Sequence, residues 1–182
     1  MKSKWKFLAI LLLIIVGLIV VVKTAREVGF RTGYAPVQPL NFSHKIHAGD
    51  NQISCQYCHF AADKSRHAGI PPTQLCMNCH TKIKKDSPEI IKLKKAISTQ
   101  ENIKWIRVHN LPDFAYFNHS QHVRVGKVSC QSCHGEVEKM ERVTQVKNMS
   151  MGWCIQCHRG NEIAPPKDHK SASGGDCAKC HQ

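Results

Sequence analysis

Residues 42–59 read FSHKIHAGDNQISCQYCH, and residues 117–134 read FNHSQHVRVGKVSCQSCH. The second stretch repeats the first 75 residues later without a gap, and in both copies eleven positions separate the first histidine from the first cysteine. Such self-similarity indicates that one structural unit has been duplicated. Another Cys-x-x-Cys-His motif follows each copy, at residues 76–80 and 154–158, and a last one lies at 177–181. We therefore expect a module with two motifs followed by a module with three.

The Cys-x-x-Cys-His motif occurs five times and contains all ten cysteines of the chain. Residues i and i+3 lie on one face of a helical turn, so the two thiols can form thioethers with one edge of a haem. The histidine that follows can then bind the iron as proximal ligand. Zinc sites usually use two cysteine pairs per metal, and neither zinc sites nor disulfides explain a histidine after every second cysteine. The motifs therefore predict five covalently attached haem c groups.

The predicted haem attachment fixes the roles of fifteen residues. The thioether cysteines are Cys55, Cys58, Cys76, Cys79, Cys130, Cys133, Cys154, Cys157, Cys177 and Cys180. The proximal ligands are His59, His80, His134, His158 and His181.

Seven further histidines are candidates for the distal iron positions: His44, His47, His67, His109, His119, His122 and His169. The first histidine of each copy is expected to bind the haem of its own copy, so that His44 faces His59 and His119 faces His134. The second histidine, one helical step away, can reach a neighbouring haem.

The remaining distal candidates have weaker patterns. His169 precedes Cys177 by eight residues, which is the offset between His47 and Cys55. His67 lies between the first two motifs and is another candidate.

Three more side chains have two interpretations each. His109 is either a ligand or a donor to a haem propionate. Met149 and Met151 lie shortly before Cys154, and a methionine ligand would raise the potential of that haem relative to two histidines. Packing against the porphyrin is the alternative for both methionines.

The N-terminal segment contains an apolar run from Phe7 to Val22, bordered by Lys6 and Lys23. Its sixteen residues give about 24 Å of helix, short of the roughly 30 Å hydrocarbon core, but flanking lysines can snorkel. A cleaved signal peptide is the alternative, although no small-x-small site follows the run. We predict an uncleaved single-pass anchor with its basic N-terminus in the cytoplasm and the rest of the chain outside.

The composition indicates that side chains alone do not form the core. The formal charge is +13, and only twelve residues are Phe, Trp or Tyr. Propionates of the haems would balance much of the charge; docking to an acidic partner ranks second, and no basic patch interleaved with aromatic residues supports nucleic-acid binding. We expect a mainly α and irregular fold with the haems as its core. The predicted parts are the cytoplasmic tail and anchor (1–24), a linker (25–40), a two-haem module (41–101) and a three-haem module (102–182).

One regular helix is predicted between the two modules. Ser87 has the character of an N-cap, and Pro88 that of a first helical residue. Ile90, Leu93 and Ile97 then follow at helical spacing.

Several stretches resemble the pentahaem cytochrome subunit of bacterial alternative complex III, namely residues 38–49, 55–59, 67–80, 105–119 and 151–159. The likeness covers nearly the whole chain, and the Phe-x-His-x-x-His arrangement also resembles cytochromes of the c7 and c3 type. Such complexes oxidise menaquinol or ubiquinol and reduce a cytochrome c or a terminal oxidase. The resemblance implies location at the bacterial inner (cytoplasmic) membrane, with the haem domain in the periplasm.

The same resemblance implies the partners. The subunit relays electrons from an iron–sulfur, molybdopterin-oxidoreductase-like subunit or a polytopic quinol-binding membrane subunit. It delivers them to a monohaem cytochrome c subunit, an external carrier or a terminal oxidase. All five motifs end in histidine, so we do not expect an enzyme on its own. The alternatives are a self-sufficient quinol dehydrogenase of the four-haem, single-anchor type and a donor to a periplasmic reductase.

Overall fold

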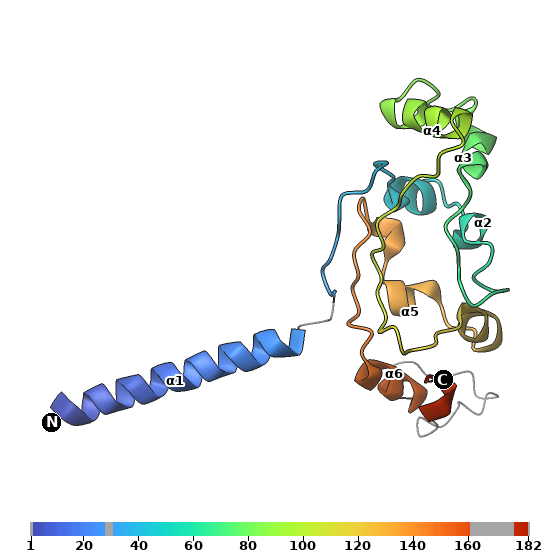
Figure 1. Ribbon diagram of the computed structural model, residues 1–182. Coiled ribbons are helices and arrows are strands. Elements are labelled where there is room, and N and C mark those ends of the chain that lie inside the picture. The colour runs from blue at the N-terminus through green and yellow to red at the C-terminus, as the bar shows by residue number, and fades with distance from the viewer. Residues whose placement is uncertain (1, 28–30, 161–176, 182) are drawn as a thin grey trace. The chain divides into compact units, whose positions relative to one another are not determined.

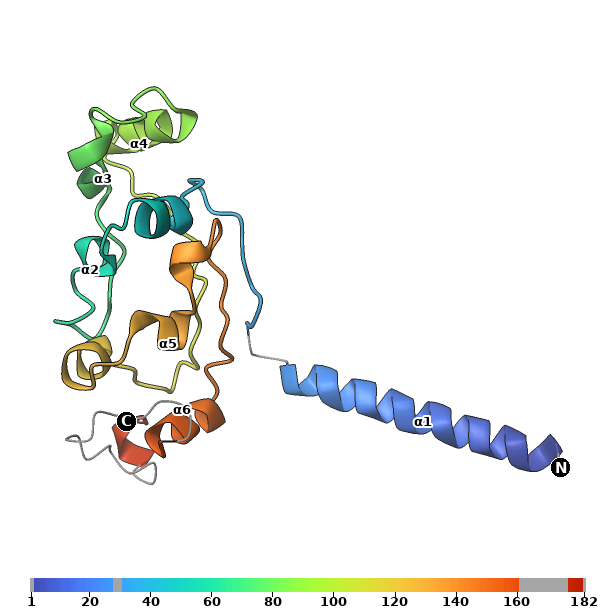
Figure 2. The same cartoon turned by 180° about the vertical axis from the view of Figure 1, so that it is seen from behind.

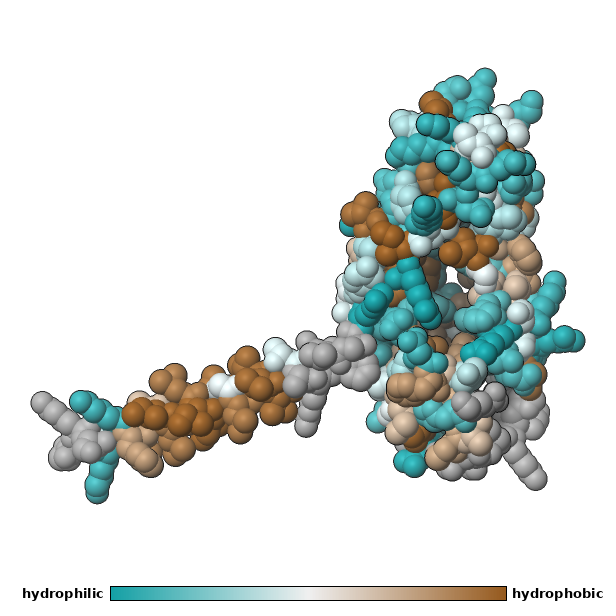
Figure 3. Space-filling model, viewed as in Figure 1, coloured by the Kyte–Doolittle hydropathy of each residue, from teal (hydrophilic) through white to brown (hydrophobic). Residues whose placement is uncertain are grey.

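The N-terminal helix forms a unit of its own. The structure, a computed structural model, describes residues 2–27, 31–160 and 177–181, and the chain separates into the compact units Met1–Arg31 and Thr32–Gln182. The first unit contains helix α1 (Lys2–Glu27) (Figure 1). Its segment Lys4–Thr24 is long and apolar enough to cross a membrane, and Figure 3 shows its exposed apolar side chains in brown. The 21 residues of this segment span about 32 Å, because the helix continues past the apolar run at both ends.

The larger unit consists of short helices joined by irregular segments, and the described ranges contain no strand. The α-helices are α2 (Cys55–Cys58), α3 (Thr73–His80), α4 (Pro88–Ser98), α5 (Cys130–His134) and α6 (Met151–His158). There are also π-helical turns, η1 (Lys45–Asp50) and η2 (Gln121–Val125), and 3₁₀ turns, η3 (Val137–Lys139) and η4 (Cys177–Lys179). This confirms the mainly α and irregular fold.

The helices of the larger unit follow one another along its length. Figures 1 and 2 show α3 and α4 together at one end and α6 at the other, with α2 and α5 between them. Four of these five helices contain a Cys-x-x-Cys pair, so the cysteine motifs are distributed from end to end of the unit.

Helix α4 forms where the sequence predicts it, and for the predicted reason. The Ser87 hydroxyl accepts a hydrogen bond from the Ile90 backbone N–H at 3.4 Å, and Pro88 occupies the first turn. The buried face of the helix contains Ile90, Leu93 and Ala96. These residues lie three positions apart, as expected for one apolar stripe on a helix.

The apolar protein core is small. Buried apolar side chains in the described residues are Leu40, Ala62, Ile90, Leu93, Ala96 and Met149. Leu40, Ile90 and Leu93 form a cluster, against which Cys76 and Trp105 pack. A unit of this length normally buries far more apolar surface, which agrees with the expectation that bound haem supplies much of the interior.

Three segments of the larger unit meet at Gln145, whose side chain is fully buried. Its backbone carbonyl accepts from the Gly33 N–H at 2.8 Å, and its N–H donates to the Tyr34 carbonyl at 3.2 Å. Its side-chain oxygen accepts from the Asn110 N–H at 3.0 Å, and its side-chain nitrogen donates to the Lys147 carbonyl at 2.9 Å. One glutamine therefore ties together three parts of the larger unit.

The first copy contacts the segment that follows the second copy. The Lys45 N–H of η1 donates to the Met140 carbonyl at 3.0 Å, and the Lys45 ammonium forms an ion pair with Glu141 at 3.3 Å. A Cβ atom at Gly49 would overlap the backbone carbonyl oxygen of Glu138. Glycine at this position is therefore required for η1 to approach the segment around η3.

Candidate haem-binding sites

Each cysteine pair lies on a helical turn, as thioether attachment to one haem edge requires. The pairs occur in α2, α3, α5 and α6, and the last pair begins in η4. None of the ten cysteines forms a disulfide bond. Among the described residues, no three His, Cys, Asp or Glu side chains converge as a bare metal site.

Four of the predicted proximal histidines face a second histidine ring. The centroid separations are 6.5 Å for His44 and His59, 6.1 Å for His47 and His80, 6.4 Å for His119 and His134, and 6.0 Å for His122 and His158. The first histidine of each copy thus faces the first motif of its own copy. The second histidine faces the motif that follows.

These separations fit an iron atom between the rings. Two metal–nitrogen bonds of about 2 Å, plus about 1.1 Å from each nitrogen to its ring centre, place the two centroids roughly 6 Å apart. The four pairs therefore have the spacing that two axial imidazoles on one haem iron require.

The local structure around the distal candidates is duplicated together with the sequence. Phe42 lies 4.8 Å from His44 and 4.3 Å from His47, measured between ring centroids. Phe117 lies at the same two distances from His119 and His122. In each copy an aromatic ring therefore supports both histidines in the same orientation.

Hydrogen bonds at Nδ1 orient these rings. His47 Nδ1 lies 2.8 Å from the Ser43 carbonyl oxygen, and His122 Nδ1 lies 2.8 Å from the Asn118 carbonyl oxygen. Since a carbonyl can only accept, the proton lies on Nδ1 and the Nε2 lone pair is available to a metal.

The pKa values of the histidines in the middle of the unit show how closely they are grouped. Burial lowers the pKa of His134 to about 4, with His109 as the next cause, followed by His119 and His59. Burial also lowers the pKa of His44 to about 4. Neutral imidazole, the form that binds iron, is therefore favoured.

The thiols of the motif in α2 lie near thiols of two other motifs. Burial raises the pKa of Cys58 in α2, and the next cause is Cys76 in α3. Burial also raises the pKa of Cys130 in α5, and here the next cause is Cys55 in α2. The motif of α2 is therefore adjacent to the motifs of α3 and α5.

Thiols of the remaining motifs also lie near one another and affect one another's pKa values. Burial raises the pKa of Cys133 in α5 to about 11, with Cys157 in α6 as the next cause. Burial raises the pKa of Cys154 in α6, with Cys180 as the next cause. Together with the arrangement of α3, α2, α5 and α6 in Figures 1 and 2, these neighbours give the motifs the spatial order 76–80, 55–59, 130–134, 154–158 and 177–181.

Buried donors without a partner also fit bound haem. Thr144 Oγ1 and Trp153 Nε1 are buried and lack a hydrogen-bond partner among the described residues. An unpaired buried donor costs about 1–3 kcal/mol, so a partner is expected. A haem propionate would accept from the indole N–H of Trp153, which directly precedes Cys154.

The remaining candidates lie in different surroundings. His67 is exposed, and His169 falls outside the described residues. His109 contacts His134, with its Nε2 atom 3.2 Å from His134 Nδ1. Met149 is buried, and Met151 is 64% exposed.

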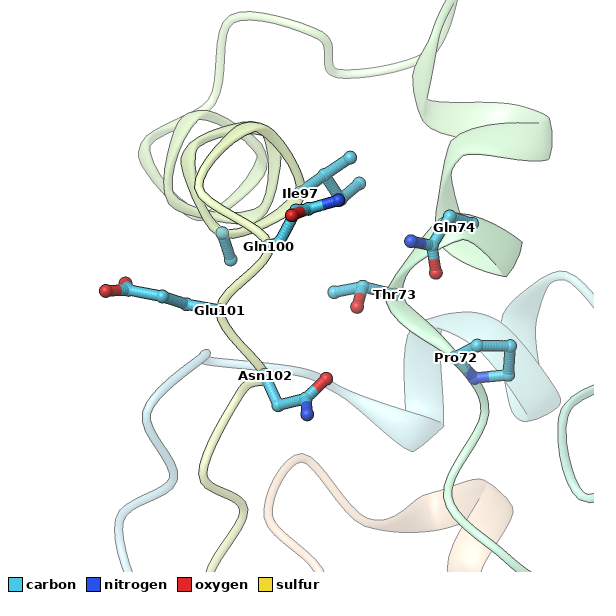
Figure 4. Close-up of a pocket in the computed structure, with 8 residues that line it drawn as sticks. Pro72, Thr73, Gln74, Ile97, Gln100, Glu101 and Asn102 are labelled. Carbon is cyan, nitrogen blue, oxygen red and sulfur yellow. The ribbon is translucent and has the colours of Figure 1, made fainter.

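A pocket of about 250 Å³ lies between the start of α3 and the end of α4 (Figure 4). It is lined by Pro72, Thr73, Gln74, Ala96, Ile97, Gln100, Glu101 and Asn102. These lining residues, all in the described part of the chain, include none of the predicted haem-binding side chains.

Helical Cys-x-x-Cys-His motifs and facing histidine rings together define a multihaem cytochrome c, an electron-transfer protein with covalently bound haem c. The chain belongs to the family of cytochrome c7 and related cytochrome c, whose pattern matches residues 40–102 and 115–182. It is also 26% identical over 165 residues to the multihaem cytochrome c subunit of menaquinone reductase from Nitratidesulfovibrio vulgaris, covering 80% of this chain and 77% of that protein.

Proposed function

We propose that the chain carries five haem c groups, one on each motif, and that four of them have two histidine ligands. The proposed pairs are His59 with His44, His80 with His47, His134 with His119 and His158 with His122. The observation that carries this assignment is the 6.0–6.5 Å separation of the facing rings. His181 is the proximal ligand of the fifth haem, for which His67 and His169 are the remaining distal candidates.

The proposed ligand set leaves no position for Met149 or Met151 on the iron of the Cys154–His158 motif. The ring that faces His158 is that of His122, so this site has two imidazoles without a methionine. Two histidines hold an iron at a lower potential than a histidine and a methionine do.

We propose that electrons move along the haems in the spatial order of the motifs. The neighbouring thiols place the motif of α3 at one end and the motif at 177–181 at the other. The haems supply the one-electron chemistry, and the chain holds them in sequence and excludes water from their faces. Electrons can then enter at one end of the larger unit and leave at the other.

We further propose that the chain is an electron-carrying subunit of a membrane complex that exchanges electrons with a quinone. Helix α1 would be retained as the anchor, with its basic N-terminus in the cytoplasm and the haem unit in the periplasm. The relative from Nitratidesulfovibrio vulgaris is named as a subunit of menaquinone reductase. The resemblance to alternative complex III favours quinol oxidation, with an iron–sulfur, molybdopterin-oxidoreductase-like subunit, a polytopic quinol-binding subunit and a monohaem cytochrome c subunit as partners.

Two measurements test this proposal. A pyridine haemochrome assay on the purified chain should give five haems per polypeptide, and a lower number would contradict the site assignment. The isolated chain should not be reduced by a quinol analogue, whereas the copurified complex should be. Reduction of the isolated chain would support the self-sufficient quinol dehydrogenase instead.

The direction of electron flow is tested on the same complex. Reduction of the haems by added menaquinol or ubiquinol, followed by reoxidation with a cytochrome c, would support quinol oxidation. Oxidation of prereduced haems by a quinone, with no reduction by quinol, would support the opposite direction named for the relative.

A further inference from the structure

Most of the proposed iron ligands are oriented by a backbone carbonyl. The Nδ1 atoms of His47, His59, His80, His119, His122 and His181 lie 2.8–3.1 Å from carbonyl oxygens of the main chain. An amide carbonyl is a weak base, so it fixes the ring and its tautomer with little effect on the electron density of the imidazole.

His134 differs from these six histidines in the partner of its Nδ1 atom. That atom lies 3.2 Å from Nε2 of His109, and the two rings meet edge to face at a centroid separation of 4.4 Å and an angle of 85°. When iron occupies Nε2 of His134, the remaining proton lies on Nδ1, so His134 donates and His109 accepts. An imidazole nitrogen is a much stronger base than an amide oxygen.

The backbone on both sides of His109 is held in place. The Arg107 guanidinium donates through Nε to the His109 carbonyl oxygen at 3.1 Å. The next residue, Asn110, donates its N–H to the side chain of the fully buried Gln145 at 3.0 Å. His109 is therefore held against His134 by contacts that do not involve either ring.

We propose that His109 is a positioning residue that accepts the hydrogen bond of His134 and thereby lowers the potential of the haem on Cys130–His134. This inference rests on the proposed function, because it takes His134 as the proximal ligand. A strong acceptor at Nδ1 increases the basicity of the bound imidazole, and a more basic ligand stabilises ferric over ferrous iron. His109 acts through His134 and is not itself bound to iron.

The test is a redox titration of the purified five-haem chain, with absorbance and EPR readouts. His109→Leu removes the acceptor and should shift one of the five midpoint potentials upward, while all haems stay attached and low-spin. His109→Gln keeps a carbonyl acceptor and should shift that potential less. Val108→Ala, a change at the neighbouring half-buried residue, should leave every potential unchanged.

The possible failures are distinguishable. Five low-spin haems with unchanged potentials in both His109 variants would overturn the inference and leave the proposed function intact. A high-spin haem that binds carbon monoxide in His109→Leu would show that His109 is an axial ligand, and would also overturn it. A wild-type chain without haem on Cys130 and Cys133 would overturn both proposals.

Discussion

The two copies of the repeat, residues 42–59 and 117–134, have the same internal geometry but different external partners. In both copies a phenylalanine ring lies 4.8 Å from the first histidine and 4.3 Å from the second. The Nδ1 partner of the proximal histidine is the Gly69 carbonyl in the first copy and the His109 ring in the second. These partners come from segments outside the repeat.

The distal histidines differ in the same way. His119 Nδ1 lies 3.0 Å from the Arg66 carbonyl oxygen, whereas His44 Nδ1 is buried without a hydrogen-bond partner among the described residues. The two copies therefore share the histidines that would face iron, but the hydrogen-bond partners of the Nδ1 atoms of these histidines differ. Because hydrogen bonds to the ligands tune the potential, two haems with the same ligand set are expected to differ in redox behaviour.

Removal of a distal histidine should have the largest effect, and it should be the same in both copies. His44→Ala and His119→Ala should each convert one low-spin haem to a high-spin haem that binds carbon monoxide when reduced, because the sixth iron position becomes open. Absorbance and EPR spectra of the purified variants measure this change. The exposed Gln121→Ala substitution in η2 is the control and should retain the wild-type spectrum.

A low-spin spectrum in either histidine variant would contradict the ligand assignment of that copy. If one copy responded and the other did not, the structural equivalence of the two copies would not extend to iron ligation.

Loss of the Gln145 side chain should lower stability through the contacts of the second module. Gln145→Leu leaves the Asn110 N–H and the Lys147 carbonyl without their partner. Both bonds are partly buried, and a fully buried group left unpaired costs about 1–3 kcal/mol, so the free energy of unfolding in guanidinium should fall by about 1 kcal/mol. Gln56→Leu, at an exposed position of the first copy, is the matched control. Equal stability of the two variants would contradict the role of Gln145.

The contact between the first copy and the segment after the second copy is tested at Gly49. Gly49→Ala would place a methyl group on the Glu138 carbonyl, and forced overpacking of this kind costs about 1–3 kcal/mol. Gly126→Ala, close to the equivalent position of the second copy, would meet backbone atoms of its own turn, the nearest being the His122 carbonyl oxygen at 2.9 Å. This approach is less close than that at Gly49, so the substitution should cost less. Gly152→Ala has no neighbour closer than 3.8 Å and is the control. Denaturation midpoints that rank Gly126→Ala below Gly49→Ala would overturn this comparison.

The sequence predicts the features that depend on spacing within the repeat. The short helices, the absence of strands in the described ranges and the N-cap of α4 at Ser87 are confirmed, since each depends on a local pattern. His44 faces His59, and His119 faces His134, as expected. Their binding to iron stays a prediction.

The features that the sequence does not predict depend on contacts between distant segments. Gln145 has no local pattern that marks it as the one fully buried glutamine of the described residues. The sequence predicts either an iron ligand or a propionate donor at His109. It does not show that the ring of His109 contacts His134, which lies 25 positions away. The partners of ligands are therefore harder to predict than the ligands themselves.

The smallest expected effect is spectroscopic and separates the two histidines of each copy. The ring planes of His44 and His59 differ by 4° and those of His119 and His134 by 7°. The corresponding angles for His47 with His80 and for His122 with His158 are 56° and 74°. In a low-spin ferric haem, the g anisotropy increases as the two imidazole planes rotate from parallel towards perpendicular.

The oxidised chain should therefore show two classes of low-spin EPR signal, each with a contribution from both copies. His44→Ala should remove intensity from the less anisotropic class, and His47→Ala from the more anisotropic class, although both substitutions lie in the same helical region. Loss from one class in both variants would show that the ring angles do not persist around iron. Loss from different classes would mean that each copy holds one nearly parallel and one strongly tilted pair, so that duplication has preserved the orientation of the ligands as well as their identity.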